Sequence, residues 1–322
     1  MAIDLSLPSE MRRGLLRVYM NAGKNILSSG LVPNRVAAAL MENYSRTLPL
    51  PRNFRSTPWI GRGEAPESRL VKGTFIRPSH QRTGRTILYF HGGGYHIGSL
   101  LSHRNMIHRL ACSAESDALY IDYKLAPAHP FPAAIEDAIA AWHALIENGH
   151  PHNKIVLAGD SAGGGLAIAL ALHLQANKKP MPAGIVAFSP WTDLSLSGNS
   201  IHKNAESDDM LSHAIVTRWA DSYLGGAGRH RSDLAKNPLA SPLFGLFHKK
   251  FPPVLIQVSR SEILFDDAQR ITDKMKAAGV EVTLQSWPGM PHIFQFFERT
   301  YPSAETAMRE AGQFIQSVFP HN

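Results

Sequence analysis

Cysteine is nearly absent, because the 322-residue chain contains only one, Cys112. A lone cysteine excludes an intramolecular disulfide and is typical of a protein that works in a reducing compartment. With no CxxC pair and no Cys/His cluster, the sequence predicts no structural zinc site, and we expect no metal in the functional site. Cys112 follows residues with helical spacing, so we expect a buried thiol without a chemical role.

Long hydrophobic runs are also missing. No stretch reaches the roughly eighteen consecutive apolar residues of a membrane-spanning helix, and the N-terminus lacks the basic and apolar regions of a signal peptide. We therefore expect a cytoplasmic protein with no stable membrane insertion. Hydrophobic residues still make up 44% of the chain and charged residues 18%, which is enough apolar material for a large folded core.

Long runs of one charge are absent as well, although the net charge is +7 and the isoelectric point is near 9.5. The densest basic sites are the pairs Arg12-Arg13 and Lys178-Lys179. Neither pair belongs to a longer basic run or to a base-stacking motif. The sequence therefore predicts no nucleic-acid partner.

The first fifty residues predict two helices that precede any strand. The first carries an apolar stripe, and the second runs from residue 33 to about residue 46. Residues 47–67 are rich in Pro, Gly and Arg, which indicates a linker or a surface crossing from the helices into the sheet domain. We therefore assign residues 1–50 to a helical cap segment. The stripe of the first helix consists of Leu7, Met11, Leu15, Val18, Ala22 and Ile26.

From residue 69 onward, strand-like runs alternate with helical patterns, an order that predicts a mostly parallel sheet with helices on both faces. This is the α/β class, and residues 51–322 are expected to form one doubly wound domain. Residues 194–240 interrupt the alternation and predict a cap insertion over the carboxyl ends of the strands. The predicted strands are 70–76, 86–90, 118–121, 155–158, 184–188, 254–258 and 280–285, and the predicted helices are 105–114, 133–147, 166–176, 211–223, 267–278 and 304–318.

The strongest chemical signal is Gly159-Asp160-Ser161-Ala162-Gly163, a G-x-S-x-G motif between a predicted strand and a predicted helix. The sharp reversal strains the backbone of the serine, and side chains two residues before and after it would collide, which explains both glycines. Ser161 is thus the predicted nucleophile. The N–H of Ala162 and the helix dipole favour negative charge beside it. Alone, the motif also fits a glycine-rich turn with an idle serine.

A second glycine-rich segment, His91-Gly92-Gly93-Gly94, directly follows a predicted strand. Consecutive glycines let backbone N–H groups approach a ligand, and these three are predicted to complete an oxyanion hole with Ala162. Each such donor accelerates a reaction by roughly a hundred- to a thousand-fold. A phosphate-binding loop is the alternative, but no lysine follows the glycines in the GK[ST] pattern.

His292 lies in a turn after the last predicted strand. In α/β folds with this serine motif, the general base follows the nucleophile and the acid in the chain, as His292 does. The loop after strand 254–258 offers Glu262, Asp266 and Asp267 as the acid. The two aspartates resemble an N-terminal helix cap, so Glu262 is the predicted partner of His292 and Asp266 is the alternative.

Together these motifs resemble the bacterial hormone-sensitive-lipase family of carboxylesterases, which has the α/β-hydrolase fold. The resemblance spans most of the chain and implies a cap built from the N-terminal helices and the insertion, with no metal or organic cofactor. It also implies that Gly93 and Gly94 donate to the oxyanion with Ala162. The family's acid is usually an aspartate, which Glu262 replaces here. The segments that carry the resemblance are HGGG (91–94), DYKLAP (122–127), HPFPAA (129–134), GDSAGG (159–164), SPWTDL (189–194) and GMPH (289–292).

Motifs and resemblance predict a serine carboxylesterase that hydrolyses short- to medium-chain esters of small molecules through an acyl-enzyme. Hydrolysis of a lactone, an acetyl conjugate or an amide is the alternative, because one constellation attacks any activated carbonyl. A non-catalytic small-molecule receptor is the remote alternative, against which Ser161 and His292 argue. No local motif encodes the oligomeric state, so a homodimer stays open. The candidate pocket residues are Met20, Ile26, Tyr95, Trp191 and Leu211, and packing in the core or the cap is the favoured alternative for most of them.

Overall fold

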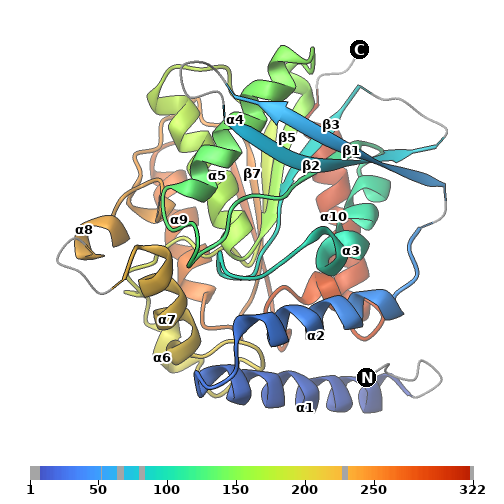
Figure 1. Cartoon of the computed structure of the whole chain (residues 1–322), viewed down its shortest axis with the longest axis vertical. Coiled ribbons are helices and arrows are strands. Elements are labelled where there is room, and N and C mark those ends of the chain that lie inside the picture. Colours follow the sequence, from blue (N-terminus) through green and yellow to red (C-terminus); the bar gives the residue numbers. More distant parts are fainter. Residues whose placement is uncertain (1–7, 52, 64–68, 80–83, 227–230, 320–322) are drawn as a thin grey trace.

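A computed structural model of the whole chain describes residues 8–51, 53–63, 69–79, 84–226 and 231–319 (Figure 1). Its strands are β1 (Phe54–Arg62), β2 (Leu70–Pro78), β3 (Thr86–Phe90), β4 (Asp117–Ile121), β5 (Ile155–Asp160), β6 (Gly184–Phe188), β7 (Val254–Ser259) and β8 (Val282–Trp287). They form one eight-stranded sheet in the order β1-β2-β4-β3-β5-β6-β7-β8. β2 runs antiparallel to both of its neighbours, and the other strand pairs are parallel, so the predicted mostly parallel sheet is confirmed.

Every strand and helix predicted from residue 69 onward is present. β3, β6 and α4 have the predicted bounds, whereas α3 begins five residues earlier than predicted. Ser99 caps α3 by accepting the N–H of Ser102, and this reciprocal capping box explains the extra turn. The helices are α1 (Ser9–Ser28), α2 (Asn34–Thr47), α3 (Leu100–Ser113), α4 (Ala133–Glu147), α5 (Ala162–Ala176), α6 (Ser200–Lys203), α7 (His213–Tyr223), α8 (Arg231–Ala235), α9 (Phe265–Ala277) and α10 (Pro302–Val318).

The central strands are apolar on both sides because helices cover both faces of the sheet. Successive side chains of a strand point to opposite faces. In β3, Ile87 and Tyr89 belong to the core that includes α3 and α10, whereas Leu88 and Phe90 belong to the core that includes α4, α5 and α9. All four are fully buried, and each such side chain stabilises the fold by about 1.5–3 kcal/mol.

The sheet brings the two glycine-rich segments together. β3 and β5 pair in parallel register, with Phe90 opposite Gly159, so the loops that follow the two strands begin side by side. β4 lies on the other side of β3, which makes this the point where the strand order reverses. Open α/β sheets bind their ligands at the carboxyl ends of the strands at such a point.

The prediction of a linker over residues 47–67 is wrong, because this segment contains β1. β1 is an edge strand that pairs with β2 in the described sheet. An edge strand tolerates proline, here Pro58, since one side of its backbone needs no ladder hydrogen bonds. Most of its residues are exposed, so it has no apolar run by which the sequence could reveal it. Residues 52 and 64–67 lie outside the described part.

Helices α1 and α2 lie across one end of the molecule, next to α6 and α7 (Figure 1). Polar contacts join the two groups of helices. Arg17 on α1 donates to Asp209 at 2.9 Å, and the indole N–H of Trp219 on α7 donates to Asn34 Oδ1 at 3.3 Å. The N-terminal helices and the inserted segment thus form one layer.

The first half of the predicted apolar stripe of α1 faces outward, whereas Ala22 and Ile26 in its second half line the cavity described below. Met11 is 54% exposed and Val18 is 70% exposed, whereas Leu16 and Met20 are buried against the rest of the molecule. Leu7, the first residue of the stripe, lies outside the described residues. α1 carries apolar residues on both faces, so the pattern predicts the helix but not the face that packs.

The prediction that Cys112 is buried is wrong. Cys112 lies in the last turn of α3 and is exposed. The buried side of this turn is formed by Leu110 and Ala111, and one step of about 100° per residue turns Cys112 away from it.

Candidate active site

Ser161 occupies a sharp turn between β5 and α5. Its φ and ψ are 52° and −121°, a conformation that costs a non-glycine residue about 1–3 kcal/mol. A Cβ added to Gly159 would lie 2.4 Å from the carbonyl oxygen of Gly163, and one added to Gly163 would lie 2.1 Å from that of Phe90. Both positions therefore require glycine, for the steric reason that the motif suggested.

α5 begins directly after this serine. Ala162 is the first helical residue, whereas the sequence placed the helix a few residues later. The first N–H groups of a helix have no partner within it, and the helix dipole adds partial positive charge there. The structure therefore places an anion-stabilising helix end beside Ser161.

His292 and Glu262 form a buried pair. His292 Nδ1 lies 3.1 Å from Glu262 Oε1, and the side chains are 3% and 0% exposed. The other carboxylate oxygen of Glu262 accepts the hydroxyl of Ser189 at 2.8 Å and the N–H of Ser259 at 3.1 Å. These two donors fix the carboxylate, which fixes the imidazole in turn.

The other two candidate acids, Asp266 and Asp267, bind groups other than His292. Asp266, the alternative acid, accepts the N–H of Ser200 at 3.0 Å and faces the inserted segment. Asp267 accepts the N–H groups of Thr192 and Asp193, both at 2.8 Å. Both aspartates lie inside the first turn of α9, which begins at Phe265, so the prediction that they cap it is wrong. They hold neighbouring loops instead.

Carboxylates control the titration of His292. Burial by itself would lower the pKa of His292, but the charge and hydrogen bond of Glu262 raise it above its ordinary value. The charges of Asp208 and Asp160 act in the same direction. The imidazolium form of His292 is therefore stabilised inside the fold.

The glycine-rich loop after β3 offers fewer free donors than predicted. The N–H of Gly92 donates to Asp160 Oδ1 at 3.0 Å, so Gly92 is removed from the predicted oxyanion hole. Gly93 and Gly94 have φ values of 105° and 61°, and Gly93 borders the cavity described below. Glycine is required at both positions because these φ values disfavour side chains.

Asp160, the variable second residue of the serine motif, was missed as a functional residue. It is fully buried, and its carboxylate accepts the hydroxyl of Tyr89 at 2.7 Å besides the N–H of Gly92. His103 Nε2 lies 3.3 Å from the other carboxylate oxygen. Burial alone would raise the pKa of Asp160, but His103 and Tyr89 lower it below its ordinary value. Asp160 thus ties the glycine loop to the end of β5.

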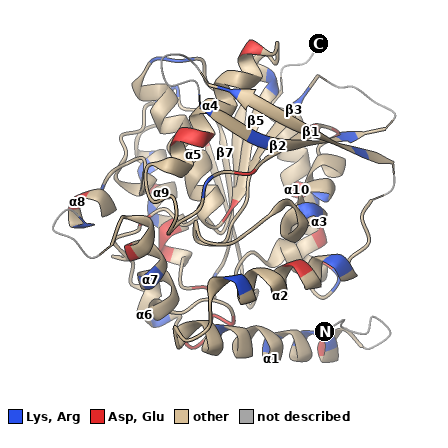
Figure 2. Ribbon diagram, in the orientation of Figure 1, with Lys and Arg blue, Asp and Glu red and all other residues tan. Residues whose placement is uncertain are grey.

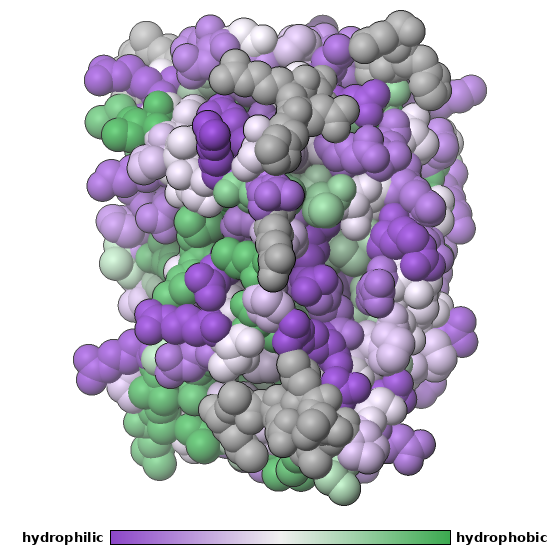
Figure 3. All heavy atoms as spheres, turned by 90° about the vertical axis from the view of Figure 1, so that its right-hand side faces the viewer, coloured by the Kyte–Doolittle hydropathy of each residue, from purple (hydrophilic) through white to green (hydrophobic). Residues whose placement is uncertain are grey.

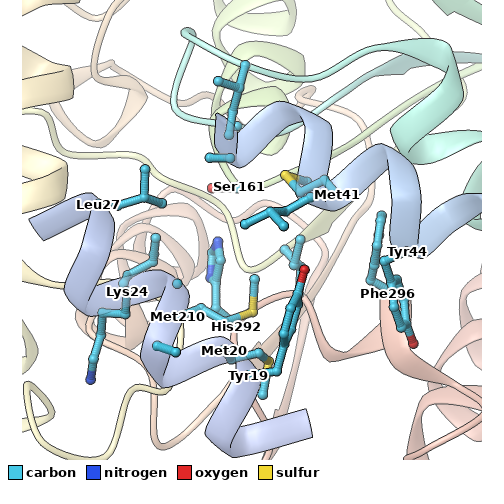
Figure 4. A pocket seen from close by; sticks show the side chains of 18 of the residues that line it. Tyr19, Met20, Lys24, Leu27, Met41, Tyr44, Ser161, Met210, His292 and Phe296 are labelled. Carbon is cyan, nitrogen blue, oxygen red and sulfur yellow. The ribbon is translucent and has the colours of Figure 1, made fainter. Parts of the chain in front are cut away.

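An apolar cavity of about 320 Å³ lies between α1, α2 and the ends of the strands (Figure 4). Ser161 and His292 both border it. Its wall is formed mainly by apolar and aromatic side chains from the two N-terminal helices and from the segments around residues 210 and 296. The lining residues include Tyr19, Met20, Ile26, Leu27, Leu40, Met41, Tyr44, Met210, Leu211, Trp219, Phe296 and Phe297.

The predicted pocket residues divide into two groups. Met20, Ile26 and Leu211 line the cavity, but Tyr95 and Trp191 do not. The Tyr95 ring stacks on Tyr223 with centroids 3.9 Å apart, and the Trp191 indole donates to the Asp193 carbonyl oxygen at 3.2 Å. Both are core residues. The sequence alone does not reveal which way a large aromatic side chain after a motif points.

Asp208 is a second residue that the sequence did not reveal. It is 1% exposed, and one carboxylate oxygen accepts the N–H groups of Met210 and Leu211, both at 2.8 Å. The other oxygen accepts the N–H of Ile263 at 2.9 Å. Ile263 follows Glu262, so Asp208 connects the cavity wall to the loop that bears the acid. Burial raises the pKa of Asp208, although His292 lowers it in part.

Comparisons with known proteins identify the family. The family described as alpha/beta hydrolase fold matches residues 87–296 of this chain. An acetyl-hydrolase of Streptomyces hygroscopicus is 40% identical over 244 residues, which cover 76% of this chain and 79% of the relative. An esterase of Acinetobacter venetianus is 34% identical over 248 residues, which cover 77% of this chain and 80% of the relative.

Solved structures agree over almost the full length. The crystal structure of an esterase from the bacterial hormone-sensitive lipase family has a TM-score of 0.81 at 35% identity, and the match covers 92% of this chain and 96% of that chain. A hormone-sensitive lipase from a metagenome library has a TM-score of 0.85 at 31% identity, covering 98% and 99%. The chain therefore belongs to the α/β-hydrolase family, among the carboxylesterases of the hormone-sensitive-lipase type.

Proposed function

We propose that Ser161, His292 and Glu262 act as nucleophile, general base and orienting acid in the hydrolysis of carboxylic esters with short- to medium-length acyl chains. The chain is an ester hydrolase by its family. One observation carries the residue assignment, namely that the strained serine and the buried His292–Glu262 pair border the same apolar cavity. Such a cavity suits the acyl or alcohol part of an apolar ester.

The first half of the reaction transfers the acyl group to the enzyme. Glu262 holds Nδ1 of His292, which leaves Nε2 to take the hydroxyl proton of Ser161 as its Oγ attacks the ester carbonyl carbon. The bond between the carbonyl carbon and the alcohol oxygen then breaks, and the alcohol leaves with the proton from Nε2. Water repeats the sequence on the acyl-enzyme, which releases the acid and restores Ser161.

The negative oxygen of each tetrahedral intermediate needs donors that are already in place. We assign this role to the backbone N–H groups of Gly93, Gly94 and Ala162. Asp160 supports them indirectly, because it fixes Gly92 at the start of the loop. The mechanism uses no metal or organic cofactor. Within the described residues there is no cluster of three or more His, Cys, Asp or Glu side chains suited to a metal ion.

Hydrolysis of an acetyl conjugate is a second candidate, since the Streptomyces hygroscopicus relative is an acetyl-hydrolase. The same triad would carry it, and the cavity would then hold the alcohol part of the substrate rather than a long acyl chain.

We also propose the division into a cap segment, residues 1–50, and a catalytic domain, residues 51–322, with residues 194–240 as a cap insertion. A cytoplasmic location and the absence of a nucleic-acid partner stay predictions. None of the helices in the described ranges could cross a membrane.

Replacing the proposed nucleophile tests the mechanism directly. Ser161→Ala is expected to lower kcat for p-nitrophenyl butyrate by about four to six orders of magnitude while binding is largely kept, because the group that forms the acyl-enzyme is gone. The purified variant should melt at or above the wild-type temperature, since alanine removes no buried partner. Near-wild-type turnover in a folded variant would refute the assignment.

Two matched carboxylate variants identify the acid. Glu262→Ala is expected to lower kcat by roughly ten-thousand-fold, because His292 loses the group that orients it. Asp266→Ala is expected to change kcat by less than about tenfold, because Asp266 bonds to Ser200 rather than to His292. Steady-state kinetics with one soluble ester measures both. A larger loss in the Asp266 variant would reverse the assignment.

The pH profile tests the influence of Asp208. His292 must be neutral to accept a proton, so kcat/KM falls as the pH drops through its raised pKa. Asp208→Asn removes one of the charges that raise this pKa, so the acidic limb should move to lower pH. Asp209→Asn is the control, because Asp209 pairs with Arg17 instead. Identical acidic limbs for the wild type and the Asp208 variant would contradict this effect.

A further inference from the structure

Exposed hydrophobic residues gather on the two N-terminal helices. The described part of the chain has ten large hydrophobic residues that are exposed, and seven of them lie between residues 11 and 40. We call these seven the cap surface. A scattered apolar residue on a surface is ordinary, but a cluster of this kind marks an interaction site. The cap surface consists of Met11, Leu15, Val18, Ile26, Leu31, Val36 and Leu40.

Helical spacing arranges the cap surface as continuous stripes. Met11, Leu15 and Val18 follow the i, i+4, i+7 pattern on the side of α1 opposite its buried residues. Val36 and Leu40 stand one turn apart on α2. Leu31 lies in the connection between the helices and is 87% exposed. Figure 3 shows hydrophobic residues gathered at the bottom of the molecule, at the level of α1 in Figure 1.

The cap surface reaches the cavity that holds the proposed triad. Ile26 and Leu40 are 46% and 36% exposed, and both also line the cavity beside Ser161. An apolar molecule at this surface is therefore next to the cavity wall. No comparable link exists for the other exposed hydrophobic residues of the described chain, Ile60, Leu70 and Leu246, none of which borders the cavity.

The charge of the same segment is strongly positive. Residues 8–47 contain six Lys or Arg and two Asp or Glu, a net charge of +4 within a chain whose net charge is +7 (Figure 2). Arg35 and Arg46 on α2 are exposed, and Arg17 on α1 is exposed but pairs with Asp209. A second copy of the chain seated on this surface would bring two positive segments together, which disfavours self-association here. An anionic partner is the complementary one.

We propose that the cap surface docks on an anionic lipid layer, with its apolar side chains in the outer acyl region and its arginines at the headgroup phosphates. An apolar helix face with basic residues beside it binds such interfaces reversibly, through buried apolar area and electrostatic attraction. Esters dissolved in the layer would enter the cavity from this side. That last consequence rests on the proposed function, whereas the docking itself does not.

Vesicle flotation tests the docking without any turnover. We would compare vesicles of phosphatidylcholine alone with vesicles of phosphatidylcholine and phosphatidylglycerol in equal parts. The wild-type protein is expected to bind the anionic vesicles at least about tenfold more strongly than the neutral ones, and added salt should weaken the binding. Equal binding to both vesicles, or no binding to either, would overturn the proposal.

Matched variants locate the binding surface. Combined Met11→Ser, Leu15→Ser and Val18→Ser substitutions should weaken binding to anionic vesicles by about tenfold or more. Ile60→Ser, Leu70→Ser and Leu246→Ser, which remove exposed hydrophobic residues elsewhere, should leave it unchanged. Arg35→Gln with Arg46→Gln is a second variant that leaves the apolar side chains in place, and it should weaken binding to the anionic vesicles only. Equal binding by all of these variants would overturn the proposal.

A turnover assay separates the docking proposal from the proposed function. Turnover of soluble p-nitrophenyl butyrate should be unchanged in these variants, because none of the substituted residues lines the cavity. Absence of turnover in the wild type would count against the proposed function alone, because vesicle binding is measured without turnover.

Sedimentation velocity detects the competing occupant of the cap surface, a second copy of the chain. A dimer that only the cap-surface serine variant loses, with no vesicle binding by the wild type, would show that a second copy covers this face.

Discussion

The backbone of Ser161 cannot relax without breaking contacts on both sides of its turn. Its N–H donates to the Phe188 carbonyl oxygen at 2.8 Å, and its own carbonyl oxygen accepts the N–H of Trp191 at 2.9 Å. The cost of the positive φ, about 1–3 kcal/mol, is offset by a sheet whose central strands are fully buried. Gly159 and Gly163 complete the constraint, since neither position has room for a side chain. The position of the nucleophile at the cavity is thus a consequence of how β5, β6 and α5 pack.

Buried carboxylates link this turn to its surroundings. Glu262 accepts a backbone N–H from the end of β7, and Asp208 and Asp160 each accept at least one from a loop. Buried carboxylates stay in place when such donors satisfy them, and their charge is then felt strongly at short range. The three groups that fix the loops therefore also raise the pKa of His292. Loop geometry and proton affinity are set by the same interactions, so a substitution at any of the three is expected to change both.

Sequence patterns predicted the parts of the molecule where local rules are strict. The turn at Ser161 needs glycines at fixed positions, and the buried strands need apolar runs. The sequence pattern therefore predicts both the turn and the strands. β1 was missed because an exposed edge strand needs neither. Asp160 and Asp208 were missed because their partners lie far away in the chain, Asp160 beside Tyr89 and Asp208 beside Ile263. The outward stripe of α1 shows the same limit, since periodicity identifies a helix but not its packing partner.

The nucleophilic role of Ser161 is tested most directly by covalent labelling. The folded protein would be treated with a fluorophosphonate, digested, and its adducts located by mass spectrometry. The proposed mechanism predicts a single adduct on Ser161, prevented by an excess of p-nitrophenyl butyrate and lost when the protein is unfolded first, because only the folded site activates the hydroxyl. An adduct on another residue would contradict it. So would a treated protein in which Ser161 is unmodified and ester turnover is unchanged.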